Sequence, residues 1–325
     1  MGESNLPENI KFYSKRMSKE TNNSHNENFT RKPFRPFVPS PFRSFAHSRF
    51  IQFWFVFLFC FFVGTILGIT LVGSTSENVF SLKMQILIMS VFAFLVPPFI
   101  LTYFWGEKPF RFLGFSTKNA DWKTLLFVAL MMIIAIPFVN LLADLNKQIS
   151  FPAFMSGFEE QMKAMEARSI AQTERLLTVH TLGGLLFNVF LIAIIPSLGE
   201  ELFFRGTLQR IFADARGAIF AVWVTAIIFS AFHFQFYGFV PRVVLGAFLG
   251  YLFLWSSNIW LPIVAHFANN AFIVIYFYFL KKSDRLIALE TVGAGETWWI
   301  GLASGIVFIG GIYFLRRNLF RRYLD

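Results

Sequence analysis

Charged residues are scarce along most of this chain. Only 15% of its 325 residues are Asp, Glu, Lys or Arg, while 55% are hydrophobic and the mean hydropathy is +0.56. This composition argues against a soluble domain and favours a protein whose outer surface faces lipid. Cys60 is the single cysteine, so no intramolecular disulfide can form. The polar first 50 residues lack the apolar run of a cleavable signal peptide.

Apolar runs, by contrast, are long and numerous. About 20 residues suffice for a helix to span a bilayer. The sequence predicts eight such spans, with seven or nine as alternatives, near residues 51–73, 82–105, 122–143, 182–204, 218–236, 240–257, 259–280 and 297–315. We therefore expect an all-α, polytopic membrane protein of about eight transmembrane helices.

Three regions follow from this pattern. Residues 1–50 are expected to form a disordered tail that becomes basic and aromatic near the first span. Residues 51–315 form the transmembrane domain, and residues 316–325 form a second basic tail. The net charge of +10 fits cations that flank membrane spans better than a nucleic-acid partner, so we expect contact with lipid and no binding of nucleic acid.

Lysine and arginine also set the expected orientation. They recur in both tails, around Lys108 and Arg111, and around Arg210 and Arg216, which all fall on one side of eight spans. We expect this side to be the cytoplasmic face of the cell membrane, with both termini there. The loop of residues 144–181 then lies outside, and its apolar spacing predicts an amphipathic helix on the membrane surface.

Two adjacent glutamates and two histidines interrupt the apolar runs. Glu200 and Glu201 close the fourth run, and His233 and His266 lie in later runs. An ionisable group inside a bilayer is costly and marks a functional site by default. Arg205 follows Glu201 by four residues on the same helical face, which predicts a structural ion pair. Glu200 points about 100° away and is left to face the bundle interior.

A further polar pair lies at helical spacing. His266 and Asn270 are four residues apart and present one polar stripe. With Glu200 and His233 they predict a site that activates water, in which Glu200 is the general base and Asn270 donates to an oxyanion. Burial favours such a base near neutral pH.

The cofactor has two alternatives. In the first, His233 and His266 hold a Zn²⁺ ion, and Glu200 or Asn270 completes the ligand set. In the second, the histidines and the glutamate activate water without a metal. No organic cofactor is expected. The depth of His233 conflicts with both alternatives, since it falls ~22 Å from residue 218 by the helical rise, deeper than the glutamates.

Three motifs carry a resemblance to a known family. Glu-Glu-x-x-x-Arg at 200–205, Phe-x-x-x-His at 229–233 and His-x-x-x-Asn at 266–270 follow one another on successive spans. In this order they resemble the motifs of the CAAX-protease and bacteriocin-processing family, which includes type II CAAX prenyl endopeptidases. The resemblance covers roughly residues 180–280. It implies a bundle with a hydrophilic cavity and an intramembrane endopeptidase, of glutamic or metal-dependent type, that acts on a membrane-associated peptide or protein.

The resemblance also implies roles for the residues of its motifs. Glu200 is then the catalytic base, and His233 is its partner or a metal ligand. His266 and Asn270 are ligands or oxyanion stabilisers. The ion pair of Glu201 and Arg205 is structural by the same analogy.

Two other classes of function fit a polar site in a membrane. A non-catalytic scaffold or immunity protein that keeps the motif for stability would survive the loss of Glu200 but not of Arg205, whose removal leaves a buried carboxylate unpaired. A transporter would use glutamate and histidine as a proton relay. Transporters often show internal repeats, and the sequence contains no long repeat.

Overall fold

The computed structural model describes residues 43–73, 78–116, 120–149, 152–280, 289 and 291–324. The chain divides into two units, residues 1–35 and 36–325, and all described residues belong to the second. Most of the predicted N-terminal tail, residues 1–42, lies outside the described residues.

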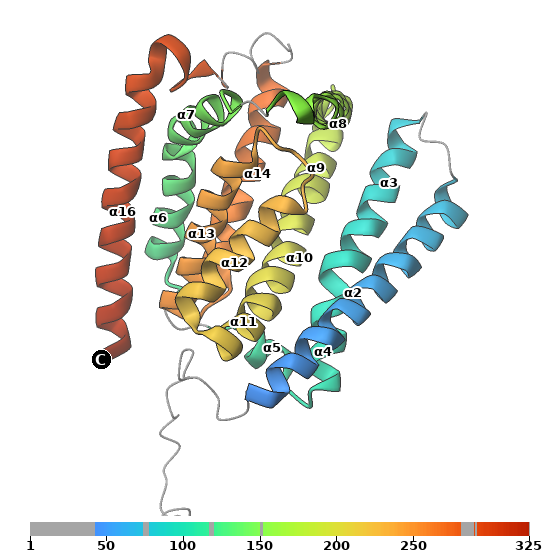
Figure 1. The fold of residues 1–325 in the computed structure, drawn as a ribbon, viewed down its shortest axis with the longest axis vertical. Helices are drawn as coiled ribbons and strands as arrows, with labels where there is room; N and C mark the ends of the chain where they lie inside the picture. The colour runs from blue at the N-terminus through green and yellow to red at the C-terminus, as the bar shows by residue number, and fades with distance from the viewer. Residues whose placement is uncertain are drawn as a thin grey trace, which may run out of the picture. The chain divides into compact units, whose positions relative to one another are not determined.

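The described residues contain helices and no strand, which confirms the all-α prediction. The helical elements are α2 (Arg43–Val72), α3 (Val79–Ser90), η3 (Val91–Leu95), α4 (Val96–Phe104), α5 (Pro109–Phe112), α6 (Trp122–Ile134), α7 (Ile136–Lys147), η4 (Ala153–Met155), α8 (Ser156–Leu177), α9 (Leu182–Asn188), η5 (Val189–Ile194), α10 (Ile195–Phe203), η6 (Phe204–Leu208), α11 (Gln209–Arg216), α12 (Ala218–Ala231), α13 (Phe239–Ser256), α14 (Trp260–Leu280), η7 (Gly295–Thr297) and α16 (Trp298–Leu324). Figure 1 shows how they are arranged.

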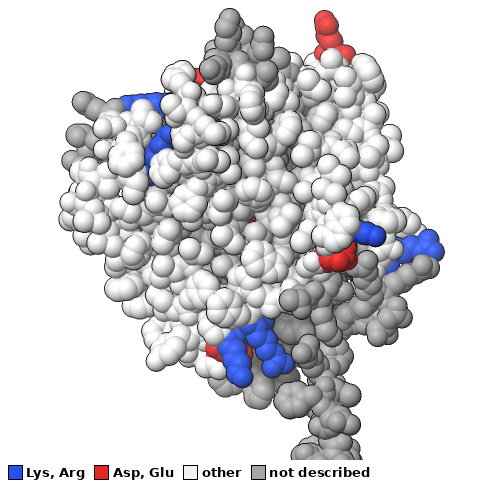
Figure 2. Space-filling model, turned by 180° about the vertical axis from the view of Figure 1, so that it is seen from behind, with Lys and Arg blue, Asp and Glu red and all other residues white. Residues whose placement is uncertain are grey.

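Seven helical stretches of the described chain are long and apolar enough to cross a membrane. They are Ser48–Val72, Val79–Phe104, Trp122–Lys147, Leu182–Arg216, Phe239–Ser256, Trp260–Phe279 and Gly295–Leu319. The remaining predicted span, residues 218–236, corresponds to α12, which is apolar but only 14 residues long. The protein is therefore an integral membrane protein. On the face seen in Figure 2, charged side chains gather towards the two ends and leave a broad uncharged area between them.

Several boundaries differ from the predicted ones. Helix α2 begins at Arg43, ahead of the expected border at residue 50, and α16 continues to Leu324, well past the expected end at residue 315. The fourth span continues to Arg216 as one helical stretch of 35 residues. The predicted surface helix is α8, and Figure 1 shows it crossing the end of the bundle where α7 ends and α9 begins.

The helix that carries the glutamates, Leu182–Arg216, is called the motif helix. It contains two π-helical turns. The turn η5 precedes α10 and the turn η6 follows it, so the segment Ile195–Phe203 lies between two local changes of helical register. Pro196 stands in the first turn of α10, where its missing N–H removes one helical hydrogen bond. Such π-turns are frequent at functional sites. The helix continues through both turns without a break, from Leu182 to Arg216.

Phenylalanines pack this helix against the N-terminal hairpin of α2 to α4. Phe203 lies 4.6 Å from Phe53 and 5.3 Å from Phe57 between ring centroids, and Phe204 lies 5.0 Å from Phe203. Aromatic pairs at these distances add about 0.5–1.5 kcal/mol each beyond the burial of their surface. Much of the unusual phenylalanine content thus fixes one side of the glutamate-bearing helix.

Two glycines of α13 hold the other side of this helix. Their carbonyl oxygens accept hydrogen bonds from side chains four residues apart: Arg205 Nη2 donates to Gly246 O at 2.9 Å, and Gln209 Nε2 donates to Gly250 O at 3.1 Å. A Cβ atom at Gly246 would lie 3.3 Å from the backbone Cα of Ala226 on α12. The absence of a side chain at Gly246 therefore lets α12 approach α13 closely.

We predict that Gly246→Val destabilises the protein. Its branched side chain must push α12 away from α13, and overpacking of this kind costs about 1–3 kcal/mol. Gly68→Val is the matched control, because no heavy atom lies within 4 Å of a Cβ placed there. Thermal unfolding of the detergent-solubilised variants measures the difference; equal melting temperatures for the two variants would contradict this account.

Candidate active site

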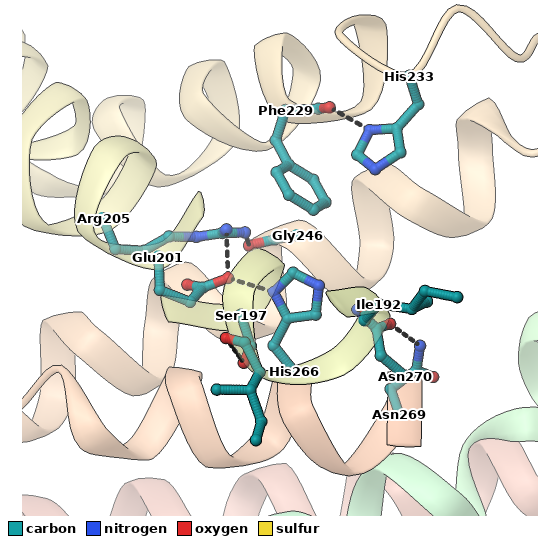
Figure 3. A network of polar contacts seen from close by, with 11 residues as sticks. Ile192, Ser197, Glu201, Arg205, Phe229, His233, Gly246, His266, Asn269 and Asn270 are labelled. Carbon is teal, nitrogen blue, oxygen red and sulfur yellow. Dashed lines mark hydrogen bonds and ion pairs between the residues drawn. The ribbon is translucent and has the colours of Figure 1, made fainter. Parts of the chain in front are cut away.

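Glu201 is the centre of a buried polar network. Its Oε1 atom accepts from Arg205 Nη1 at 2.8 Å and from His266 Nδ1 at 2.8 Å. The side chains of Glu201 and Arg205 are completely inaccessible, and that of His266 is 9% exposed. Figure 3 shows this cluster between the motif helix and α14. The structure thus contains the predicted Glu201–Arg205 pair, and it adds a contact to His266 that the sequence analysis did not foresee.

The guanidinium of Arg205 is held on several sides. It donates to Glu201 and to Gly246 O, and it lies 4.6 Å above the centroid of the Phe229 ring. A buried cation of this kind requires such partners, because an unpaired charge in a low-dielectric interior is very costly. The three elements that supply them are therefore tied to one another through Arg205.

His233 lies in the turn that follows α12, beyond the last residue of that helix. Its Nδ1 atom lies 2.9 Å from Phe229 O, and a carbonyl only accepts, so Nδ1 carries the proton and Nε2 is left as an acceptor in the neutral ring. The Phe229 ring lies 5.0 Å from the ring of His233 and 6.0 Å from that of His266. Both imidazoles therefore flank Phe229, as Figure 3 shows.

The conflict over the depth of His233 is resolved at Gly217. Glu201 precedes this residue by sixteen positions and His233 follows it by sixteen, so equal lengths of mostly helical chain separate the two residues from the same corner. Gly217 has a φ angle of 93°, a conformation that glycine adopts without strain, and its N–H donates to Ala213 O at 2.9 Å. Because the glutamate helix continues to Arg216, the two arms that leave the corner reach the same depth.

Asn270 lies one helical turn after His266 on α14. Its Nδ2 atom donates to Ile192 O at 3.3 Å, and its Oδ1 atom accepts from Asn269 Nδ2 at 3.2 Å. Ile192 belongs to the π-turn η5, so Asn270 connects α14 to the irregular part of the glutamate helix. The bond to Ile192 is long, and a stronger acceptor can compete for this amide group.

Glu200 lies beside this network and is not part of it. Its side chain is half-buried, and its Oε2 atom is inaccessible and lacks a hydrogen-bond partner among the described residues. Four charged or titratable groups interact with it electrostatically: His266, Glu201, Arg205 and Arg242. The structure thus brings Glu200 near the predicted site residues, with one of its oxygens buried and unpartnered among the described residues.

Arg242 is a site residue that the sequence analysis missed. It lies in the first turns of α13 and interacts electrostatically with both Glu200 and His233. Its Nη1 atom is buried without a hydrogen-bond partner in the described ranges. The signal was present in the sequence, because an arginine inside the apolar run 240–257 satisfies the same criterion that singled out the glutamates.

The donor set does not fit a resident zinc ion. Such an ion takes at least three protein ligands. Within the described ranges, no three His, Cys, Asp or Glu side chains are placed to hold a metal. His233 and His266 each have one ring nitrogen outside their hydrogen bonds to Phe229 O and Glu201, so the two histidines supply two of the three ligands that such an ion takes.

Comparison with known proteins places a family domain over this site. Residues 182–272 match the family model of the type II CAAX prenyl endopeptidase Rce1-like proteins. We refer to this matched segment, which is less than a third of the chain, as the Rce1-like domain. The family recognised from the three motifs is thereby confirmed, and the matched residues include all seven motif positions from Glu200 to Asn270.

Part of the chain also matches a curated protein. "Uncharacterized protein YpbD" of Bacillus subtilis (strain 168) is 26% identical over 88 residues, which are 26% of this chain and 42% of YpbD. The similarity thus spans less than half of either protein. No solved structure matches the chain.

We predict that Arg205→Met strongly destabilises the Rce1-like domain. Glu201 would remain buried with only His266 beside it, and breaking a buried pair costs about 3–5 kcal/mol. The double variant Glu201→Gln/Arg205→Met should lose less than the two single variants together, because it leaves no uncompensated charge.

Arg49→Met is the matched control for Arg205→Met. Arg49 pairs with Glu107 at 3.3 Å, but both side chains are partly exposed, and such pairs contribute at most about 1 kcal/mol. Unfolding by denaturant in detergent micelles compares the variants. A similar loss of stability for both single variants would refute a special role for the buried pair.

Proposed function

We propose that the protein is an intramembrane endopeptidase whose Rce1-like domain hydrolyses a peptide bond with activated water. The observation that carries the proposal is the unpartnered Oε2 atom of Glu200, next to the bonded cluster of Glu201, Arg205 and His266. A free carboxylate oxygen beside ordered imidazoles is the arrangement that general-base catalysis requires. Its position inside apolar helices matches a substrate in or at the membrane.

In the proposed reaction, Glu200 activates the attacking water. A water molecule donates one hydrogen bond to Glu200 and the other to Nε2 of His233, which is an acceptor in the neutral ring. Glu200 takes a proton as the water oxygen bonds to the carbonyl carbon of the substrate. The C–N bond then breaks, and Glu200 passes the same proton to the leaving amine nitrogen.

The developing negative charge falls on the former carbonyl oxygen. Asn270 supplies a hydrogen-bond donor from α14, and its weak bond to Ile192 leaves the amide able to change its acceptor. His266 donates from Nε2 only as an imidazolium, because its Nδ1 proton is bonded to Glu201. Donors of this kind contribute most when they are held in place before the reaction. Glu201 and Arg205 act as positioning residues, because Glu201 fixes the ring of His266.

We propose that this chemistry proceeds without a resident metal, since the donor set offers two histidine nitrogens and one carboxylate that is needed as the base. The substrate is a membrane-associated peptide or protein, and a prenylated C-terminal peptide is the class named in the description of the matched family. We further propose that both termini face the cytosol of the cell, with the basic residues near α11 and near the C-terminus on that side.

Cleavage by the reconstituted protein tests the proposal. We expect vesicles that contain the full chain to cleave an internally quenched peptide, offered with and without a farnesyl group on a cysteine near its C-terminus. Glu200→Gln should lower kcat by about 10²–10⁴-fold, because general-base catalysis contributes this much. Fluorescence gives the rate, and mass spectrometry identifies the cleaved bond.

Lys108→Gln serves as the control, because Lys108 lies in the connection between α4 and α5 and outside the site. Each variant must show the wild-type melting temperature before its rate is compared. Cleavage by Glu200→Gln at the wild-type rate would refute the mechanism and favour a non-catalytic scaffold. Absence of cleavage by the wild type, with these peptides and with protein extracts analysed for new C-termini, would refute the peptidase proposal.

A further inference from the structure

The turn that carries His233 is held by side chains from outside the motif helices. Gln235 Nε2 donates to Ser169 Oγ at 2.6 Å, and the backbone N–H of Tyr237 donates to Glu166 Oε2 at 3.1 Å. Both acceptors belong to α8. From the end of α7, Asn146 Nδ2 donates to Phe236 O at 2.8 Å. Three consecutive residues of this turn are thus bonded by two other elements.

The backbone of this turn is strained next to His233. Phe234 has a φ angle of 52°, which is unfavourable for a bulky residue and costs on the order of 1–3 kcal/mol. The Phe234 side chain is 74% exposed, so its own packing within the protein does not compensate. A strained residue persists only where its surroundings fix it. The bonds from Glu166, Ser169 and Asn146 are the contacts that do so here.

One face of α8 contacts the turn that carries His233. Four half-buried residues of α8 recur at spacings of three and four: Glu159, Met162, Glu166 and Ser169. Glu166 and Ser169 are the members of this face that bond to the turn. Large apolar residues of α8 outside this face stay exposed, with Phe158 at 52% and Met165 at 45%. Polar bonds to the His233 turn are therefore a main attachment of this part of α8.

Glu166 also extends the charge network of the site. It interacts electrostatically with Arg242, which in turn interacts with Glu200. A change at position 166 can therefore act in two ways: through the hydrogen bond to Tyr237 or through the charge that faces Arg242. Replacement by glutamine keeps an acceptor oxygen and removes the charge, whereas alanine removes both.

We propose that Glu166 and Ser169 are positioning residues for His233, with Glu166 acting through the hydrogen bond that it accepts from Tyr237. The loop between α7 and α9, which lies outside the matched domain, thereby completes the site. The catalytic part of this inference rests on the proposed function. The attachment of the His233 turn to α8 does not depend on the proposed function, and it is measurable without any substrate.

Hydrogen–deuterium exchange of the peptide that contains residues 232–238 tests the hold. In Glu166→Ala the amide of Tyr237 loses its acceptor, and we expect its exchange to accelerate at least about tenfold. Glu166→Gln should keep the wild-type protection. Glu160→Ala is the matched control, because Glu160 is an exposed carboxylate on the same helix. Equal exchange in Glu166→Ala and Glu160→Ala would overturn the proposal, as would loss of protection in Glu166→Gln.

Kinetics with the quenched peptide test the effect on His233. We expect Glu166→Ala to lower kcat at least about tenfold with KM within about threefold, and Glu166→Gln to recover most of the loss. Ser169→Ala, which removes a smaller contact, should give a smaller decrease in kcat and serves if Glu166→Ala fails to fold. If the wild type cleaves and Glu166→Ala cleaves equally well, the inference is wrong; if Glu166→Gln is as slow as Glu166→Ala, charge acts instead of the hydrogen bond. If the wild type does not cleave, the peptidase proposal fails, and the exchange experiment alone decides the role of α8.

Discussion

The structure depends on the compensation of one buried carboxylate. Glu201 has no access to solvent, and its charge is balanced by Arg205 and by a hydrogen bond from His266. These partners come from two separate helical stretches, and Arg205 bonds in addition to α13 and stacks on α12. The side chains of Glu201 and Arg205 are inaccessible, so water does not replace the contacts between them. The four helices that surround the site must therefore stay in one arrangement for the charge to be tolerated at all.

This constraint explains why adjacent glutamates serve different purposes. A helix turns about 100° per residue, so Glu201 can meet Arg205 and His266 only if Glu200 points elsewhere. Glu200 then borders the same network without being bonded by it, and one of its oxygens has no protein partner within the described residues. Stability and chemistry are thereby separated by one position in the sequence. The turns η5 and η6 on either side show that the regular helix is adjusted around this pair.

Much of this arrangement was predictable from the sequence. The apolar runs gave the helices, and the four-residue spacing of Glu201 and Arg205 gave their contact, because both features depend on local periodicity. The bond between Glu201 and His266 joins residues 65 positions apart, and no local pattern encodes it. Helix ends were less predictable: α12 ends at Ala231, although its apolar run continues through Phe232 and Phe234, because the backbone leaves the helix in a strained turn. Arg242 was overlooked although its position in an apolar run marks it as clearly as Glu200.

The corner at Gly217 sets the relative positions of Glu201 and His233. Glu201 and His233 lie sixteen residues before and after it. The number of residues in each arm therefore determines where the two side chains lie relative to each other. Inserting a single residue into either arm would advance one group by ~1.5 Å and rotate it by ~100° about its helix axis. The lengths of the two arms are therefore coupled. A functional change of length in one arm requires a matching change in the other, or a further π-turn that absorbs the extra residue.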